Sequence, residues 1–311
     1  MSAPSTIIQR RDLFDLVKDF SLEGNRKGYV GLDIMPLFDT ALQSGNFPSI
    51  DSEEMMKPAD VKRSNRGTYN RIDFAFGQDN YQCQEYGLEG PVDDALAENY
   101  DSYFSAEAEM QDILLHKLAE EQEKRVAAVV QAEAANASAN PWSNASTGTP
   151  RADVITGIKA VLDRTGIMPD SLHMTWDKFQ DVLKSNEFSD SDKYTSNILT
   201  SGFETQKNVI KSFLGVDNLY VSFGVYNGAD EGQAFSGTDI WTDTEAFLFI
   251  KGGAGLQGGP AYGKTMNWAN DELVGTESYE EPQSRATILR VRHHRDEKVI
   301  TSAAGYRLTA L

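Results

Sequence analysis

The chain has 311 residues, 40% of them hydrophobic and 10% aromatic, which is enough to bury one large core or two smaller ones. Lys and Arg number 29 against 47 Asp and Glu, a formal net charge of −18. Affinity for nucleic acid comes largely from cations that release counterions from phosphates. This charge therefore disfavours direct binding to DNA or RNA.

The single cysteine, Cys83, excludes an intrachain disulfide and fits synthesis in a reducing cytoplasm. Arg10 and Arg11 stand where a secretory signal needs an apolar run, and no later stretch reaches the roughly 18 apolar residues of a membrane span. We expect a protein that is soluble when synthesised and has no membrane partner.

Residues 1–60 combine one short amphipathic stretch with irregular sequence rich in Gly, Pro and Ser. The apolar face of that stretch is formed by Leu13, Phe14, Leu16, Val17 and Phe20. These few apolar residues cannot form a core of their own. We therefore expect an extended arm with one helix that lies on the body or on a neighbouring molecule.

A change to strict alternation after Gly67 predicts a long β-hairpin within residues 61–91. Ile72, Phe74 and Phe76 would lie on one face of the first strand, residues 77–80 would form a polar turn, and the second strand would run from Tyr81 to Tyr86. An isolated two-stranded hairpin is only marginally stable in water, so its aromatic residues need a partner surface.

Asp93 and Asp94 can cap a helix that continues to about Ala135, with a break near residues 100–105. Its charged run at 120–125 (EEQEKR) is interpreted as a solvated face. The Ala, Asn and Ser-rich segment 132–149 then marks a boundary, with Trp142 as an anchor.

The rest of the chain alternates helices and strands, which predicts an α+β fold. A helix should begin at Pro150 and end at Gly166, and another should end at Gly215. A strand at 171–174 leads into a helix capped by Thr175, and further strands are expected at 219–225 and 246–250. Two closing strands, 286–292 and 299–308, should be joined by a polar turn at 293–297.

The strongest enzymatic motif is the segment from Gly258 to Thr265, which satisfies the phosphate-binding pattern GxxxxGKT. A phosphate loop belongs near the start of a parallel α/β domain and needs a later strand that ends in a magnesium-binding Asp. Neither condition is met. The overlapping dinucleotide-type match at 253–258 has no amphipathic helix after it, so we expect a surface loop over 252–265.

The four histidines, His116, His173, His293 and His294, lack the spacing of a metal site. No activated nucleophile motif such as GxSxG is present either. The sequence thus predicts no catalytic, metal-binding or cofactor-binding residues and no enzyme activity.

Several segments, in this order, resemble the major capsid proteins of tailed double-stranded DNA bacteriophages, the Hong Kong 97-type capsid fold. They are Tyr69–Phe76 (YNRIDFAF), Tyr86–Ala95 (YGLEGPVDDA), Pro141–Trp142, Pro169–Phe179 (PDSLHMTWDKF) and Ala303–Leu308 (AAGYRL). Together they span roughly residues 60–311. An anionic chain would also suit a container that holds a polyanion without adhering to it.

The resemblance implies four regions and a shell built by self-association. The regions are an N-terminal arm (1–60), an extended β-hairpin loop (61–91), a peripheral domain with a spine helix (92–149 and 286–311) and an axial domain (150–285). The implied partners are copies of the chain itself, in hexamers and pentamers, together with a separate scaffolding protein, a portal and a decoration protein. The implied location is the virion capsid, assembled in the bacterial cytoplasm around DNA that is bound without sequence specificity.

Six residues are predicted to form the assembly interface, because they are apolar or aromatic and lack partners nearby in the sequence: Leu13, Phe14, Phe74, Phe76, Tyr81 and Tyr86. Two alternatives stay open. One is an encapsulin-like nanocompartment shell, which the irregular arm disfavours, and the other is a P-loop nucleotide-binding enzyme.

Overall fold

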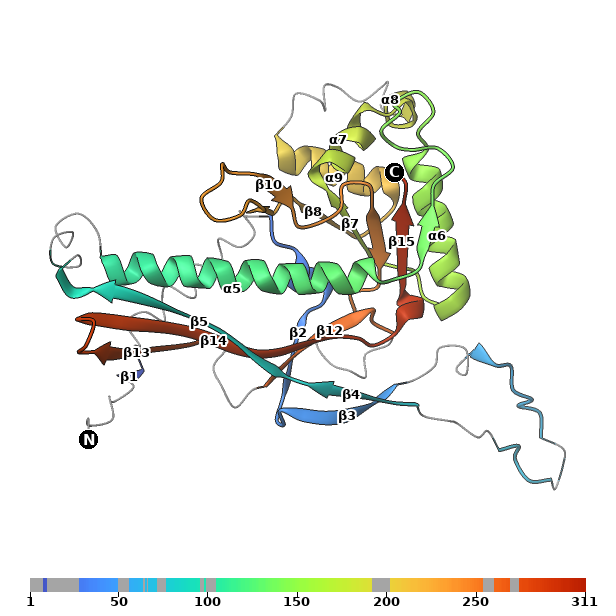
Figure 1. The fold of residues 1–311 in the computed structure, drawn as a ribbon. Coiled ribbons are helices and arrows are strands. Elements are labelled where there is room, and N and C mark those ends of the chain that lie inside the picture. The colour runs from blue at the N-terminus through green and yellow to red at the C-terminus, as the bar shows by residue number, and fades with distance from the viewer. Residues whose placement is uncertain are drawn as a thin grey trace.

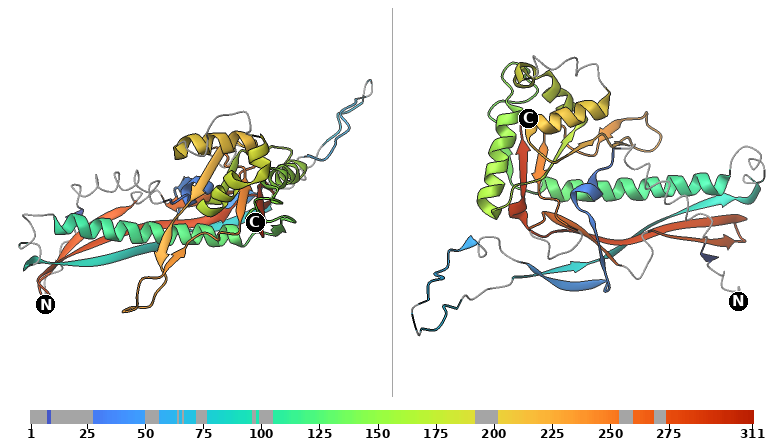
Figure 2. Two further views of the ribbon diagram at one scale, coloured as in Figure 1. Left: turned by 90° about the horizontal axis from the view of Figure 1, so that it is seen from above. Right: turned by 180° about the vertical axis from the view of Figure 1, so that it is seen from behind.

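The computed structural model describes residues 8–9, 28–49, 56–63, 65, 67–71, 77–95, 98, 105–191, 202–253, 260–268 and 274–311. Helices and strands are intermixed in these residues, as the α+β prediction requires. The longest helix, α5 (Ala106–Gln131), lies along an elongated sheet, and a second sheet with further helices stands beside its C-terminal end (Figure 1). A narrow two-stranded ribbon extends away from both sheets (Figure 2).

The elongated sheet has the strand order β1, β13, β14, β12, β2, and β5 pairs with β14 as well. Its central strand β14 is the longest and pairs with three other strands. The members are β1 (Ile8–Gln9), β2 (Leu37–Thr40), β5 (Gln84–Asp93), β12 (Gly263–Trp268), β13 (Gly275–Glu281) and β14 (Ala286–Val299).

The second sheet has the order β6, β15, β11, β7, β8 and is packed against helices. Its strands are β6 (Ala135–Ala137), β7 (Ser171–Thr175), β8 (Asn218–Ser222), β11 (Ala246–Phe249) and β15 (Gly305–Thr309). The helices of this part are α6 (Pro150–Thr165), α7 (Trp176–Lys184), α8 (Asn186–Ser191) and α9 (Phe203–Leu214). A small hairpin, β9 (Val225–Asn227) with β10 (Gly237–Asp239), and the 3-10 turn η3 (Ser302–Ala304) complete it.

Local signals placed several of these elements correctly. Helix α6 begins at Pro150, and Gly166 ends it in the left-handed conformation with φ 71°. Helix α9 likewise ends at Gly215, with φ 75°. Ser105 caps α5 through its side-chain oxygen, which accepts from the amide of Ala108, so the long helix begins after the predicted break.

The predicted turn at residues 77–80 is wrong. Those residues open strand β4 (Gly77–Gln82), which pairs antiparallel with β3 (Ser44–Ser49) and not with the strand that follows it. The chain then continues into β5, which pairs with β14. The observed ribbon is therefore built from the end of the predicted arm and the middle of the predicted hairpin.

The predicted polar turn at residues 293–297 is also wrong, because these residues continue β14. Two of their charged side chains, Arg295 and Glu297, are paired with residues of α5, and pairing of this kind lowers the cost of burying them. Arg295 donates to Gln122, and Arg125 binds Glu297 through two hydrogen bonds of 3.1 and 3.0 Å.

Each of the two large sheets contains strands from more than one of the predicted regions. Strands β12 and β13, from the predicted axial range 150–285, belong to the elongated sheet. Strand β15, from the predicted peripheral range, belongs to the second sheet. Of the predicted arm, the stretch 28–40 packs into the body, with Ile34 and Met35 fully buried. The chain therefore crosses between its two parts more often than the sequence suggested.

Helix α5 and the elongated sheet are joined by two different kinds of contact. The N-terminal half of the helix packs through an apolar cluster of Val92, Leu114, Leu115, Leu118, Leu289 and Val291. In the C-terminal half the predicted solvated face is wrong, because Glu120, Gln122 and Glu123 are all at least 94% buried. Gln122 accepts from Arg295 of β14, whereas Glu120 pairs with Lys117 and Lys124 of the same helix.

Glu123 is the most connected of these polar residues. Its carboxylate accepts hydrogen bonds from the amides of Val30 and Gly31, at 2.9 and 2.7 Å, and from the indole nitrogen of Trp241 at 2.7 Å. Burial raises the pKa of Glu123, and the three donors oppose that shift by stabilising the charged form. One side chain thereby joins α5 to the short helix α2 (Gly31–Ile34) and to the loop before β11.

We predict that Glu123→Ala lowers the free energy of unfolding by about 3 kcal/mol or more, because it leaves three buried donors unsatisfied. Glu123→Gln should cost less, about 1–3 kcal/mol, since one donor then faces the new amide group. Urea unfolding of the purified chain measures both values, with Glu121→Gln on the exposed side of the same helix as the control. Equal stability of all three variants would contradict this role of Glu123.

Two buried histidines predict a loss of stability in mild acid. Burial lowers the pKa of His173 to about 3, and burial together with Arg295 and Arg125 lowers that of His293 to about 2. Both folded pKa values lie below the unfolded value of about 6.5. The unfolded chain therefore takes up protons first, and stability is present above pH 6.5 and lost as the pH falls.

As the pH falls from 6.5 to 5, each of these histidines should lower the free energy of unfolding by up to about 1.4 kcal/mol per pH unit. Urea unfolding at pH 7, 6 and 5 measures that slope. His173→Gln should remove about half of it, and His173→Gln combined with His293→Gln should remove both contributions. A pH-independent midpoint over this range would refute the prediction.

Candidate assembly interface

The β3–β4 ribbon is largely exposed in the part of the chain that the structure describes. Its strands pair from Ser44 with Gln82 to Ser49 with Gly77, and nearly all side chains of β4 are exposed. At its base, Phe47 and Cys83 pack with Met266 of β12 in a small buried cluster. A two-stranded ribbon is only marginally stable alone, so this element needs a covering surface along its length.

Beyond the ribbon, the described residues 56–63 and 67–71 form an extended loop held by its own contacts (Figure 2). The Arg63 side chain donates to the carbonyl of Gly67 at 2.7 Å and lies 4.7 Å from the centre of the Tyr69 ring. Val61 and Tyr69 are 89% and 73% exposed. Large apolar and aromatic groups so exposed at the end of a projection are typical of a surface that contacts another molecule.

Of the six predicted interface residues, the structure places two. Tyr81 packs against the cluster at the ribbon base, and its hydroxyl donates to the carbonyl of Leu42 at 3.4 Å. Tyr86 packs under α5, where Arg125 lies 3.7 Å from its ring centre. Both therefore have partners within the chain. The other four, Leu13, Phe14, Phe74 and Phe76, lie outside the described residues.

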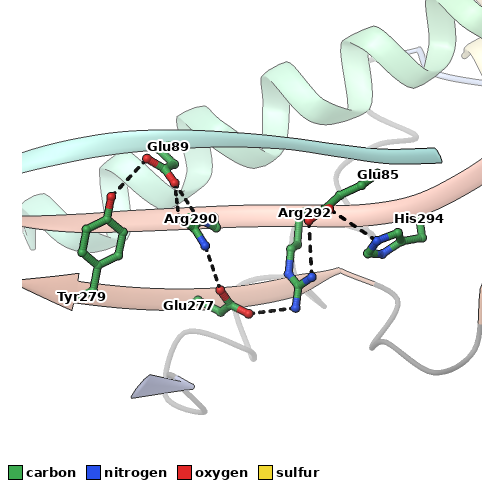
Figure 3. Close-up of polar contacts among 7 residues, drawn as sticks. All are labelled: Glu85, Glu89, Glu277, Tyr279, Arg290, Arg292 and His294. Carbon is green, nitrogen blue, oxygen red and sulfur yellow. Dashed lines mark hydrogen bonds and ion pairs between the residues drawn. The ribbon is translucent and has the colours of Figure 1, made fainter. Parts of the chain in front are cut away.

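The face of the elongated sheet opposite α5 carries a row of ion pairs (Figure 3). Along β14 the apolar Leu289 and Val291 point to the helix, so by the two-residue period of a strand Arg290 and Arg292 point away. The row crosses three neighbouring strands and is made by Glu85, Glu89, Glu277, Tyr279, Arg290, Arg292 and His294.

Glu277 of β13 is the centre of this row. It accepts from Arg292 at 2.9 Å and from Arg290 at 3.5 Å, and each arginine also binds a carboxylate of β5. Single exposed ion pairs contribute at most about 1 kcal/mol, but a connected network is stronger than isolated pairs. The network links the three strands β5, β14 and β13 on the face opposite α5 and so supports their register. The alternation of Arg and apolar residues at 288–292 was a sequence signal for it.

The GKT motif does not form a phosphate site. Gly263, Lys264 and Thr265 lie in strand β12, not in a loop that opens a helix. The Lys264 ammonium donates to the carbonyl of Gly253, and the Thr265 hydroxyl donates to the carbonyl of Met35 at 2.9 Å. The expected surface loop at 252–265 is thus wrong for its last three residues, which are buried. The sequence pattern that suggested nucleotide binding therefore does not form a phosphate-binding loop.

Two further properties bear on the class of protein. Within the described ranges, no three His, Cys, Asp or Glu side chains are grouped so that they could hold a metal ion. No helix in the same ranges is long and apolar enough to cross a membrane. The Cys83 thiol is buried, and burial raises its pKa.

The arrangement of spine helix, elongated sheet, projecting ribbon and second α+β part defines a fold, that of viral and encapsulin shell proteins. No known protein-family profile matches the chain, and no curated protein matches its sequence. Solved structures do match, and they include phage capsid proteins of the Hong Kong 97 type, so the predicted fold is confirmed.

The first of these is a phage-related protein from Bordetella bronchiseptica, at 18% identity and a TM-score of 0.72, with 98% of each chain covered. The capsid of cyanophage P-SCSP1u matches at 9% identity and a TM-score of 0.56, over 89% of this chain and 86% of that one. The encapsulin of Synechococcus elongatus matches at 11% identity and a TM-score of 0.53, over 100% of this chain and 92% of that one.

We predict that Lys264→Ala destabilises the chain, because it removes the buried methylene groups of the lysine side chain and leaves a cavity. The expected loss is about 2–3 kcal/mol, measured by urea unfolding. Lys264→Met, which refills the volume, should be close to the parent. ATP should not raise the melting temperature of either the parent chain or the variants. A nucleotide-dependent rise that Lys264→Ala abolishes would restore the phosphate-site interpretation.

Proposed function

We propose that the chain is the major capsid protein of a tailed bacteriophage, a structural shell subunit without a catalytic role. The observation that supports this most is the match of nearly the whole chain to a phage-related protein. Pentamers and hexamers of the chain would form an icosahedral head around double-stranded DNA. The part built on the second sheet would meet its copies around the five-fold and six-fold axes, and the part built on α5 would lie at the periphery.

The exposed surfaces support a subunit that is completed by its neighbours. The ribbon and the extended loop carry exposed side chains, and so do helix α6 and the connection after it, where Ile155 and Met168 are 50% and 60% exposed. A stable contact buries about 800 Å² per partner. We propose that Leu13, Phe14, Phe74, Phe76, Tyr81 and Tyr86 contribute to such contacts.

The net charge of −18 supports enclosure of DNA by confinement. Repulsion between an anionic shell and a polyanion keeps the nucleic acid mobile inside it. Further proposed partners are a separate scaffolding protein, a portal and a decoration protein, with assembly in the host cytoplasm and a final place in the virion. The encapsulin-like shell stays the second candidate, because the Synechococcus elongatus encapsulin structure covers the whole chain.

Electron microscopy and sedimentation of the purified chain test the proposal. Expressed alone, the chain should give unclosed or irregular shells together with free oligomers, and co-expression with a scaffolding protein should give uniform closed particles. Nuclease-protected DNA in particles from infected cells would support the phage head, and a packaged enzyme would support the encapsulin. A chain that stays monomeric at high concentration, with or without a scaffold, would refute both.

A further inference from the structure

The β9–β10 hairpin carries an exposed apolar patch on the side that faces away from α5. Its Tyr226 packs toward α5, where the ammonium of Lys124 lies 3.8 Å from the centre of the Tyr226 ring. By the two-residue period of a strand, the neighbouring Val225 points the other way. Val225 and Phe235 are 46% and 75% exposed. They lie together, because a Cβ added at Gly237 would be 3.3 Å from each of their side chains.

The loop of this hairpin is held in one conformation by Asn227 and is anionic. The Asn227 side-chain oxygen accepts from the amides of Ala229 and Ser236, at 3.1 and 3.0 Å. Every residue from 223 to 239 is described, and this stretch contains three anions and no cation. The anions are Asp230, Glu231 and Asp239, and all three are exposed. An apolar patch with a charged rim has the composition of a contact surface.

Further carboxylates lie beside the hairpin. Asp243 follows β10 in the sequence, and Asp177 stands in the first turn of α7. Burial, and then the negative charges of Asp239 and Asp177, raise the pKa of Asp243. The three carboxylates are thus close enough to repel one another. A cationic surface brought by another molecule would relieve this repulsion.

Helix α6 has the opposite character on its exposed side. Val154 and Val161 face the core, and the other side of the helix carries a stripe that alternates cations with apolar residues. This α6 stripe consists of Arg151, Ile155, Lys159 and Leu162. Ile155 and Leu162 are 50% and 37% exposed. The exposed charged residues of α6 are three cations and one anion, a net charge of +2: Arg151, Lys159, Arg164 and Asp163.

The hairpin and the α6 stripe lie on opposite sides of the second sheet. The hairpin follows β8 at one edge of the sheet, whereas α6 packs on β15 near the other edge, with Gly157 against the Tyr306 ring. The views from the front and from behind agree on this placement (Figures 1 and 2). One copy therefore cannot bring its hairpin onto its own α6 stripe, and a second copy can.

From this complementarity we propose that the β9–β10 hairpin of one copy docks on the α6 stripe of the next copy. The apolar patch of the hairpin covers the apolar residues of the stripe, and the hairpin carboxylates pair with the cations of the stripe. The contact joins two different surfaces, so it repeats head to tail and closes into a ring when the rotation between copies allows it. It rests on the proposed shell function and names two partner surfaces within it.

Charge reversal tests the contact. A hairpin variant carries Asp230→Lys and Glu231→Lys, and a helix variant carries Arg151→Glu and Lys159→Glu. Each should form at least about tenfold fewer shells than the parent, because like charges then face each other. A chain with all four substitutions restores opposite charges at the contact and should assemble like the parent.

The matched control is Asp94→Lys with Glu98→Lys. It makes the charge change of the hairpin variant at exposed positions of the β5–α5 connection and should assemble normally. All substituted side chains are exposed, so urea unfolding should give every variant the midpoint of the parent. Failure to assemble can then be assigned to the contact and not to the fold.

Cross-linking of thiols locates the contact. A chain with Ala234→Cys on the hairpin and Thr156→Cys beside the stripe should give a ladder of covalent oligomers with a flexible bifunctional thiol reagent. The parent is the background, since its own Cys83 is buried. Ala234→Cys combined with Asn208→Cys, on the exposed side of α9, should give no ladder. Equal cross-linking of both pairs would contradict the assignment to α6.

The outcomes separate this contact from the proposed function. If the parent forms shells and both reversal variants assemble as well as the control, the contact is refuted and the shell function stands, whatever else the hairpin binds. If the parent forms no shells, the shell function fails, and a concentrated mixture of the Ala234→Cys chain with the Thr156→Cys chain still tests the contact. Cross-linked dimers that appear only in the mixture support it, and their absence overturns it.

Discussion

The carboxylate of Glu123 is the contact on which the two parts of the molecule depend. It stands on the long helix and accepts hydrogen bonds from the segment at 28–31 and from Trp241 of the second part. Arg307 of β15 strengthens the same junction, because it donates to the carbonyls of Gln131 and Glu133 at the end of that helix and binds Glu245. A buried charge with this many partners holds three distant segments in one geometry.

The elongated sheet has two faces with different functions. The face toward α5 combines an apolar cluster with the Arg125–Glu297 ion pair and the buried Arg295, and the other face carries the ion-pair row around Glu277. Both networks join strands that are remote in sequence. The sheet therefore keeps its register through side-chain contacts on both of its faces.

Local signals predicted the helices and failed for the long-range pairings. Pro150, Gly166 and Gly215 mark helix ends by their own backbone preferences, so α6 and α9 were predictable. The partner of β4 is β3, some thirty residues earlier, and no local pattern indicates it. The charged run at 120–125 looked solvated because its partners, such as Glu297, are 172 residues from Arg125. In the candidate interface, Tyr81 and Tyr86 were selected because they are aromatic. Their contacts within the chain involve residues distant in sequence and could not be predicted from it.

In the described part of the chain, the contacts that join the β3–β4 ribbon to the body include the cluster of Phe47, Cys83 and Met266 and the hydrogen bond from the Gln82 amide to Asp296. A projection held at one end acts as a lever, so a rotation of a few degrees at the anchor moves the far end by many times the displacement at the base. In the proposed shell, the body of the subunit would then stay rigid while the ribbon met neighbours at different inclinations. One sequence would in this way fit positions of unequal curvature without a second conformation of its core.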